Sequence, residues 1–350
     1  MKTVPVNASK SYSVLIGSGL LADLGARVKD IAGVCKAAII SDSNVHPLYG
    51  QKVSDSLEKA GFQIVTFVFP AGESSKNGDT YLKLLNFLAE NHLTRTDCLI
   101  ALGGGVVGDL TGFAAATYLR GISYIQVPTT LLAAVDSSVG GKTAIDLTAG
   151  KNLCGAFYQP SLVLCDTDTL NTLPDDIFRD GCAEVIKYGV LYDEALFNQL
   201  AQTGLDFPRE DVIARCVQWK RDVVIQDEFD RGQRQKLNLG HTIGHGVEAH
   251  SGFMTSHGKA VAIGMAMVSR AAAKQNLCSA ETAAAIESII KSFTLPTVTA
   301  DSAAAIYEGA LSDKKRFGGS VNLIVPVEIG NCIIHTVTTD ELKTFIEAGQ

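Results

Sequence analysis

The sequence has no uninterrupted apolar run long enough to cross a bilayer, and its first residues contain no apolar signal core. Its eight cysteines form no C-x-x-C pair, and several lie in apolar stretches, which indicates buried thiols in a reducing compartment. Positive charge is also scarce: 30 Lys and Arg oppose 37 Asp and Glu, which gives a net charge of −7. We therefore expect a cytoplasmic protein that binds neither membranes nor nucleic acid.

The chain divides into two parts by pattern. At 350 residues it is long enough for two domains. Up to residue 173, short apolar strands alternate with amphipathic helices, a βαβ rhythm that predicts a parallel sheet. After residue 173 the alternation nearly vanishes, and helical stretches rich in Ala, Ile and Leu follow. The sequence predicts an α/β domain over 1–173 and a mostly α-helical domain over 174–350.

Open α/β sheets bind ligands at the carboxyl ends of their strands, so the residues that follow each expected strand are candidates. Asp42 follows the first buried strand, 37–40, and could bind a ribose or an adenine. A helix N-cap or a turn is an equally good interpretation of this acid. Further strands are expected at 64–69, 98–102, 124–127 and 162–165.

A glycine-rich loop over 103–109 fits G-x-G-x-x-G between a strand and a helix. Its glycines allow close approach of the backbone to a pyrophosphate, and the helix N-terminus favours negative charge. The dinucleotide fingerprint is incomplete, because the loop is not in the first βα unit and no acid lies about twenty residues further on. We interpret it as a phosphate-binding loop for a dinucleotide, and the alternative is a structural glycine turn.

A second segment, 136–144 followed by 150–152, is dense in Gly, Ser, Thr and Lys and would suit an anion. It lacks the first glycine of a Walker A loop, and a solvated loop is the alternative.

The segment 234–257 contains most of the histidines of the chain. His241 and His245 are four apart and would share one face of a helix, where two imidazoles can bind one metal ion. His257 could fold back to the same point, and Arg234 and Asn238 would lie on the same helical face. Spacing alone pairs His241 with His245 but does not decide which histidines bind metal. Ordinary hydrogen-bonded histidines remain the alternative.

Glu184 stands in a mostly apolar helical stretch, three residues before Lys187. It could form an ordinary salt bridge with that lysine, or it could complete a His/His/Glu metal site. The later charge run 313–316 is either a solvated face or a basic wall for an anionic substrate.

Six motifs together carry a resemblance: GGGVVGDLTGFAAATYLRG, QVPTTLLAAVDSSVGGKTAID, GKN, GCAEVIKYG, LNLGHTIGH and SHGKAVAIGM. They resemble the 3-dehydroquinate synthase family of sugar phosphate cyclases, in order and over nearly the whole chain. The resemblance implies a Rossmann-like N-terminal domain that holds NAD, a mostly helical C-terminal domain that holds one zinc or cobalt ion, and a homodimer.

The resemblance also implies the site residues. It assigns Glu184, His241 and His257 to the metal and makes His245 a substrate contact, which corrects the pairing from spacing. Its NAD contacts are Asp42, Glu73, Lys76, Gly105, Val106, Val107, Gly108, Asp109, Thr129, Thr130, Lys142, Lys151, Thr169, Leu170, Asn171 and Thr172. Its substrate contacts are Arg120 (across the dimer interface), Asp136, Lys142, Asn152, Lys187, Lys220, Arg234, Asn238, His245 and Lys314, with Lys315 as an alternative to Lys314.

The implied reaction converts the sugar phosphate 3-deoxy-D-arabino-heptulosonate 7-phosphate into 3-dehydroquinate and phosphate, within the shikimate pathway. NAD takes a hydride and returns it, phosphate is eliminated, and an aldol step closes the ring. Alternatives are an alcohol dehydrogenase of the glycerol dehydrogenase type, a cyclase for another sugar phosphate, and a non-catalytic NAD-binding protein. The phosphate-binding set of Lys142, Asn152, Lys187 and Arg120 argues against the dehydrogenase.

Overall fold

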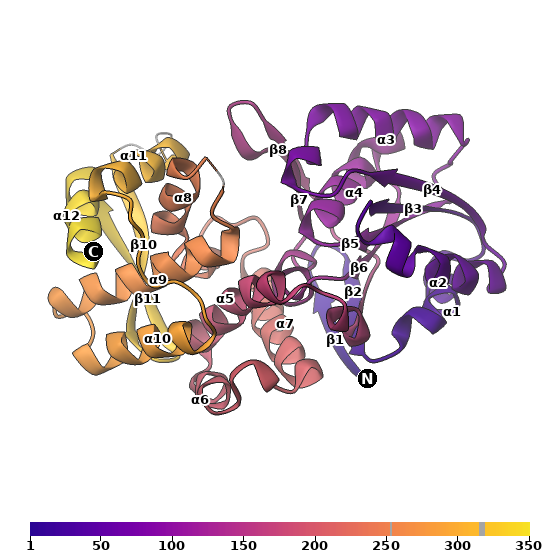
Figure 1. Cartoon of the computed structure of the whole chain (residues 1–350). Helices are drawn as coiled ribbons and strands as arrows, with labels where there is room; N and C mark the ends of the chain where they lie inside the picture. The colour runs from indigo at the N-terminus through magenta and orange to yellow at the C-terminus, as the bar shows by residue number, and fades with distance from the viewer. Residues whose placement is uncertain (253, 315–318) are drawn as a thin grey trace. The chain divides into compact units, whose positions relative to one another are not determined.

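The computed structural model describes residues 1–252, 254–314 and 319–350 (Figure 1). The chain forms two compact units. Unit 1 contains residues 1–173 and 209–229, and unit 2 contains residues 174–208 and 230–350.

Unit 1 is built on a seven-stranded sheet in the order β1-β2-β9-β6-β5-β3-β4. Only β1 and β2 pair antiparallel, and every other pair is parallel. This arrangement confirms the predicted α/β class. The strands are β1 (Lys2–Asn7), β2 (Ser11–Gly17), β3 (Lys36–Asp42), β4 (Gln63–Phe69), β5 (Cys98–Gly103), β6 (Ser123–Pro128) and β9 (Leu162–Asp166).

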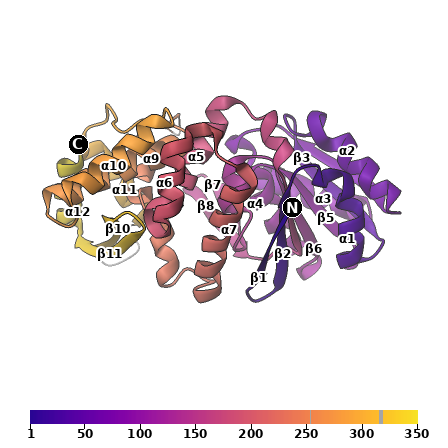
Figure 2. The ribbon, with the colours of Figure 1, turned by 90° about the horizontal axis from the view of Figure 1, so that it is seen from below.

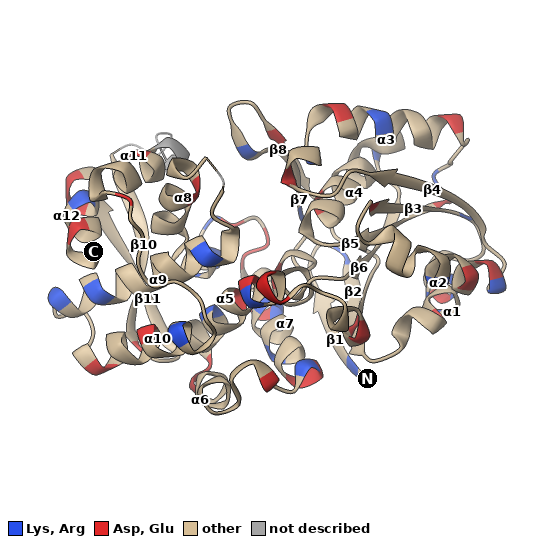
Figure 3. Cartoon of the chain, in the orientation of Figure 1, with Lys and Arg blue, Asp and Glu red and all other residues tan. Residues whose placement is uncertain are grey.

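Helices cover both faces of this sheet, so its central strands are apolar on both sides. Along β3, Ala37 and Ile39 enter one core cluster, and Ala38 and Ile40 enter the other. Figure 3 shows that β5 and β6 carry no charged residue, as expected for strands in the middle of a covered parallel sheet. The covering helices are α1 (Leu24–Ala32), α2 (His46–Lys59), α3 (Gly78–Glu90) and α4 (Gly105–Thr117).

About half of the segment expected to be an anion-binding loop lies in a β-hairpin instead. Strands β7 (Lys142–Leu147) and β8 (Gly150–Phe157) pair antiparallel. The hairpin packs on α4 at Gly112, where a Cβ would lie 2.4 Å from Thr143 Cγ2. Its strands are short and partly exposed, so their apolar pattern is weak and composition alone suggested a loop.

Helix α7 (Arg209–Gln226) packs with unit 1, although the sequence places these residues in the second domain. It contacts β1 and β2 and the turn η4 (Ala133–Ser137). The amino group of Met1 lies 3.4 Å from Glu210 Oε2, and Lys2 forms an ion pair with Asp211. A helical pattern in a sequence does not indicate the sheet on which a helix packs, so the sequence alone could not assign these residues to unit 1.

Unit 2 is mostly helical, as predicted, and α9 lies at its centre (Figure 2). The buried residues of α9 face α5, α8, α10 and α12. The unit also contains an antiparallel β-hairpin near the end of the chain. The elements are α5 (Asp175–Tyr192), α6 (Glu194–Thr203), α8 (His241–His250), α9 (His257–Lys274), α10 (Ala280–Ser292), α11 (Ala303–Lys314), β10 (Ser320–Glu328), β11 (Asn331–Thr338) and α12 (Thr339–Gly349).

The described part of the chain can be inspected for disulfides and for membrane-spanning helices. All eight cysteines lie within it, and none of them forms a disulfide. Among the helices of the described residues, none is both long and apolar enough to cross a membrane.

Candidate functional site

The glycine loop of unit 1 joins the carboxyl end of β5 to the start of α4. Glycine is required here by close packing: a Cβ on Gly103 would lie 2.4 Å from Val107 Cγ2, and one on Gly104 would lie 3.0 Å from Thr130 Cγ2. Gly105 begins the helix, so the backbone N–H groups of its first turn have no partner inside the helix. This is the geometry that binds phosphate groups.

The residues around this loop differ in which of their groups are accessible to a nucleotide. Val107 is fully buried in the core, so only its backbone could contact a ligand. Gly108 packs against Gln126, whose Oε1 would lie 2.5 Å from a Cβ at that position. Thr129 and Thr130 follow β6, and the Thr129 N–H donates to the Gly103 carbonyl at 3.0 Å. The loops after β5 and β6 are thereby held together.

A buried lysine connects two of the expected contact groups. Lys76 Nζ donates to Asp109 Oδ2 at 2.6 Å and to Asn152 Oδ1 at 2.5 Å. Burial alone would lower the pKa of Lys76, but the charges of Asp109 and Glu73 raise it, so the lysine remains cationic. Two of its three donors are occupied in this way, and one remains for a ligand.

Asn152 sits at the start of the exposed half of the hairpin with a φ of 57°, a left-handed conformation that asparagine tolerates. Its N–H donates to Asp146 Oδ1 at 2.8 Å. Because its side-chain oxygen accepts from Lys76, its NH2 group is the part suited to donate to a phosphate oxygen.

Other expected nucleotide contacts have local structural roles. Asp42 Oδ1 accepts from the N–H groups of Asn44 and Val45 at 2.8 and 2.9 Å, which is the turn interpretation, and it leaves Oδ2 for a ligand. The Thr169–Thr172 segment follows β9, and Tyr49 Oη donates to the Thr169 carbonyl at 3.1 Å. Leu170 is buried, so its side chain belongs to the core.

The remaining expected contacts of unit 1 lie on several elements. Asp136 in η4 forms an ion pair with Lys220 of α7, which is one of the contacts that join α7 to this unit. Arg120 and Lys142 are exposed, and Arg120 has a φ of 68° in the short turn after α4. Glu73 begins the turn η2 (Glu73–Ser75), and Lys151 lies beside Asn152 on β8.

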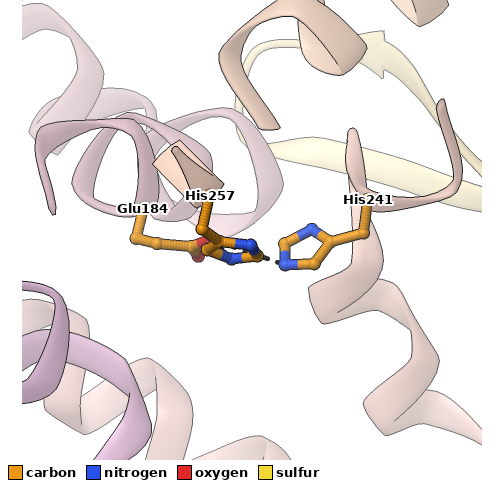
Figure 4. A group of neighbouring side chains, drawn as sticks. All are labelled: Glu184, His241 and His257. Carbon is orange, nitrogen blue, oxygen red and sulfur yellow. Dashed lines mark ion pairs between the residues drawn. The ribbon is translucent and has the colours of Figure 1, made fainter. Parts of the chain in front are cut away.

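In unit 2, three side chains from three helices meet at one point (Figure 4). Glu184 comes from α5, His241 from the start of α8 and His257 from the start of α9. The Nε2 atoms of His241 and His257 lie 3.5 and 3.4 Å from the same oxygen, Glu184 Oε1. The Glu184 side chain is fully buried. A buried carboxylate facing two imidazole nitrogens is the donor set of a divalent cation site.

The two histidines of the cluster differ in the direction of their pKa shifts. His241 Nδ1 lies 3.0 Å from the Leu239 carbonyl and donates to it, so Nε2 presents a lone pair. Burial, Lys187 and the neighbouring histidines lower the pKa of His241 well below its usual value. Burial would also lower the pKa of His257, but Glu184 and Glu248 raise it to about 10.

The helix carrying His257 is fixed to the helix carrying Glu184. Asp180 Oδ1 accepts from Ser256 Oγ at 2.5 Å and from the Lys259 N–H at 3.0 Å. A Cβ on Gly258 would lie 2.0 Å from the Asp180 carbonyl oxygen, so only glycine allows this approach.

Two of the expected substrate contacts of unit 2, Lys187 and His245, lie beside this cluster. Lys187 forms an ion pair with Glu184, so both interpretations of that acid agree with the structure. The His245 ring centroid lies 5.6 Å from that of His241. Lys314 ends α11, but its side chain is outside the described part of the chain, as is the whole of Lys315.

One helical expectation was wrong. Arg234 and Asn238 do not continue the helix of His241. They lie in the 3-10 helix η7 (Gln233–Asn238), and Gly240, with a φ of 78°, turns the chain before α8 begins. A Cβ on Gly240 would lie 2.6 Å from the Val261 carbonyl oxygen, so the glycine marks a close approach to α9.

Sequence reasoning missed three residues of these sites: Asp146, Asp180 and Glu248. Glu248 carried a usable signal, because it lies three residues after His245 and seven after His241, on the same helical face. Asp146 and Asp180 carried none, since their roles depend on segments distant in the sequence.

Comparison with solved structures gives the class. A 2-deoxy-scyllo-inosose synthase complexed with carbaglucose-6-phosphate, NAD+ and Co2+ aligns with a TM-score of 0.89, 25% identity and complete coverage of both chains. ValA, the 2-epi-5-epi-valiolone synthase of Streptomyces hygroscopicus with NAD+ and Zn2+ bound, aligns with a TM-score of 0.89 and 26% identity over 99% of this chain and 98% of that one. The chain has the fold of the sugar phosphate cyclases.

Sequence comparison narrows this class. The family description "3-dehydroquinate synthase N-terminal" matches residues 66–180, and "3-dehydroquinate synthase C-terminal" matches residues 181–316. The 3-dehydroquinate synthase of Streptococcus suis is 44% identical over 345 residues, which are 96% of this chain and 97% of that protein. That of Clostridium acetobutylicum is 42% identical over 99% of each chain. The chain belongs to the 3-dehydroquinate synthase family.

Proposed function

We propose that this chain converts 3-deoxy-D-arabino-heptulosonate 7-phosphate into 3-dehydroquinate and phosphate, as a carbon–oxygen lyase of aromatic amino acid biosynthesis. The observation that carries the proposal is the cluster of Glu184, His241 and His257 in a chain of this family. A redox-neutral cyclisation would use a divalent cation, a hydride carrier and an anion site, and the chain offers residues that could hold each.

The metal ligands in this proposal are Glu184, His241 and His257. Two imidazoles and one carboxylate suit zinc or cobalt and leave a coordination position for substrate. A cation held there would supply a Lewis acid for the hydroxyl to be oxidised. The paired Lys187 balances the Glu184 charge and holds that carboxylate in place.

The nucleotide in this proposal is NAD, held at the carboxyl edge of the sheet in unit 1. Bound NAD supplies a hydride acceptor that later returns the hydride, so the reaction shows no net oxidation. The start of α4 favours the pyrophosphate, and the remaining donor of Lys76 can reach a ligand oxygen. The residues proposed to contribute are Asp42, Glu73, Lys76, Gly105, Val106, Val107, Gly108, Asp109, Thr129, Thr130, Lys142, Lys151, Thr169, Leu170, Asn171 and Thr172.

The substrate residues in this proposal divide by the group they bind. A phosphate dianion needs several positive or N–H donors, and a carboxylate needs a cation of its own. Asp136 and His245 would orient hydroxyl groups and move protons, and Asn238 would donate to the substrate. The phosphate set is Arg120, Lys142, Asn152 and Lys187, and the carboxylate set is Lys220, Arg234 and Lys314.

We also propose that the enzyme is a cytoplasmic homodimer in which Arg120 serves the phosphate of the partner copy. The exposed side chain of Arg120 and its position after α4 are compatible with this role. Sedimentation velocity of the purified protein tests the dimer.

The experiment for the reaction follows phosphate release and NADH absorbance in one cuvette, with the heptulosonate phosphate, NAD and zinc. Stoichiometric phosphate with no net NADH is expected. NADH without phosphate would instead support a dehydrogenase, since glycerol dehydrogenase of Schizosaccharomyces pombe shares the fold at a TM-score of 0.66 and 18% identity. If neither signal appears with this substrate, a cyclase for another sugar phosphate becomes the better explanation.

A further inference from the structure

The two histidines of the metal cluster both present Nε2 to Glu184 (Figure 4). Their other ring nitrogens have different partners. His241 Nδ1 faces a backbone carbonyl, that of Leu239, at 3.0 Å. His257 Nδ1 faces a carboxylate oxygen, Glu248 Oε2, at 3.6 Å. The Nδ1 atom of one ring therefore faces a neutral acceptor, and that of the other ring faces a charged one.

Glu248 lies in the last turns of α8 and is only 4% exposed. Burying a carboxylate is costly unless hydrogen bonds or opposite charges compensate for the lost hydration. Because α8 packs against α9, the acid reaches His257 at the start of the neighbouring helix. The contact between Glu248 and His257 thus joins two helices that both contribute to the cluster.

We propose that Glu248 is a positioning residue that keeps Nδ1 of His257 protonated and directs its Nε2 to the metal ion. The inference rests on the metal site of the proposed function. A carboxylate behind a ligating histidine fixes the ring orientation and raises the basicity of the ligand nitrogen. Asp180 fixes the backbone of the same helix end, so His257 is held by both its main chain and its ring.

The geometry also allows Glu248 to be a metal ligand, and this is the alternative that the experiment must distinguish. His245, Glu248 and His257 form a second group whose potential ligand atoms lie within 4.8 Å of one another. A metal ion bound there would use the His257 nitrogen that faces Glu248, and Glu248 would be a ligand. We favour the positioning role because Glu184, at the other group, is fully buried, and because the proton on His241 already leaves Nε2 for that group.

The experiment measures Co2+ binding to metal-free, full-length protein by absorption titration, which requires no turnover. Glu248→Ala should weaken Co2+ affinity about 10- to 100-fold. Glu248→Gln keeps an oxygen that accepts from Nδ1, so it should restore most of that loss and keep the wild-type band positions. Glu347→Ala, which removes an exposed helical glutamate of the same unit, is the matched control and should bind as the wild type does.

Three results would overturn the inference: wild-type affinity in Glu248→Ala, equal weakening in Glu248→Gln and Glu248→Ala, or a stoichiometry that falls from two ions per chain to one. Urea unfolding of the metal-free variants shows whether they fold. If Glu248→Ala does not, Glu248→Asp serves in its place, because it keeps the charge but withdraws the acceptor by one methylene, and it should also bind Co2+ more weakly.

Glu184→Gln separates this inference from the proposed function. If Glu184→Gln binds Co2+ as the wild type does, or the wild type binds none, the metal assignment itself is wrong. If Glu184→Gln loses Co2+ while Glu248→Ala keeps it, the metal assignment stands and only the role of Glu248 is rejected.

Discussion

The nucleotide edge of unit 1 and the histidine cluster of unit 2 are built in opposite ways. The first uses backbone groups of one continuous stretch, 103–109, at the point where a strand becomes a helix. The second uses side chains of three helices, α5, α8 and α9. A site made of backbone leaves a contiguous motif in the sequence, whereas a site made of distant side chains is completed only by packing.

The two sites also differ in how their charges are balanced. In unit 1 the charge of Asp109 is compensated by Lys76. In unit 2 Glu184 has Lys187 on one side and two histidines on the other, which is an arrangement that a divalent cation completes. Substitutions in unit 2 should therefore act on metal binding and turnover, and those in unit 1 on stability and nucleotide binding.

The largest expected effect is that of Glu184→Gln. Losing the metal removes several kcal/mol of transition-state stabilisation, so turnover should fall by about a thousandfold. Phosphate release and bound zinc are measured together, and thermal melting reports whether the fold is retained. Glu347→Gln is the control, and full turnover in Glu184→Gln would refute the metal assignment.

Lys76→Met tests the charge pair of unit 1. It leaves the partly buried Asp109 without its cation, which should cost about 1–3 kcal/mol of unfolding free energy. Urea denaturation measures this cost. Adding Asp109→Asn should recover most of it, because the uncompensated charge is then gone. If the two substitutions are simply additive, Lys76 and Asp109 do not act as a pair.

Gly258→Ala in unit 2 and Gly108→Ala in unit 1 compare the steric cost of a Cβ at a closely packed glycine in the two units. The Cβ of Gly258→Ala would meet the Asp180 backbone carbonyl, which cannot move alone, so we expect a loss of about 1–3 kcal/mol and weaker metal binding. Gly108→Ala in unit 1 meets only the end of the Gln126 side chain, which can turn away, and should cost less. Urea denaturation of both variants checks the ranking, and the reverse order would contradict it.

The smallest expected effect is a pH dependence in unit 2, far from the cluster. The hydrogen bond from Lys291 lowers the pKa of Glu287 below its usual value, with a further contribution from Arg270. A lowered pKa means stability that is present above the unfolded-state pKa and is lost as pH falls through the folded-state pKa. Glu287→Gln should therefore cost about 0.5 kcal/mol near pH 7 and nothing in strong acid. A cost that does not change with pH would show that the charge is irrelevant.

The sequence predicted the sheet of unit 1 well because its strands are short, apolar and separated by amphipathic helices. It also predicted the glycine loop, because all residues of that loop are contiguous in the sequence. Spacing alone failed at the histidines: His241 and His245 do share a helix, but Glu184 and His257 come together with His241 only through the packing of α5 and α9. The resemblance supplied that grouping, and it remains a prediction until metal binding is measured.

Other errors have equally local causes. Gly240 interrupts a helical pattern with a left-handed turn that the neighbouring residues do not indicate. The β7–β8 hairpin was hidden by its Gly, Ser and Lys content. Residues 209–226 were assigned only to the mostly helical second half of the chain. The ion pair of Lys220 with Asp136, which joins α7 to unit 1, spans a separation that sequence patterns do not report.

The return of α7 has a consequence for how the protein is made. The chain leaves unit 1 after residue 173, comes back at 209 and leaves again after 229. On the ribosome, the sheet of unit 1 can form early, but its last helix emerges only after part of unit 2 has been synthesised. A fragment that stops at residue 173 would expose the surface that α7 covers and leave Asp136 without Lys220. Neither unit can therefore be obtained intact by a single cut of the gene, and a separate unit 1 would require α7 to be rejoined to residue 173 by a designed linker.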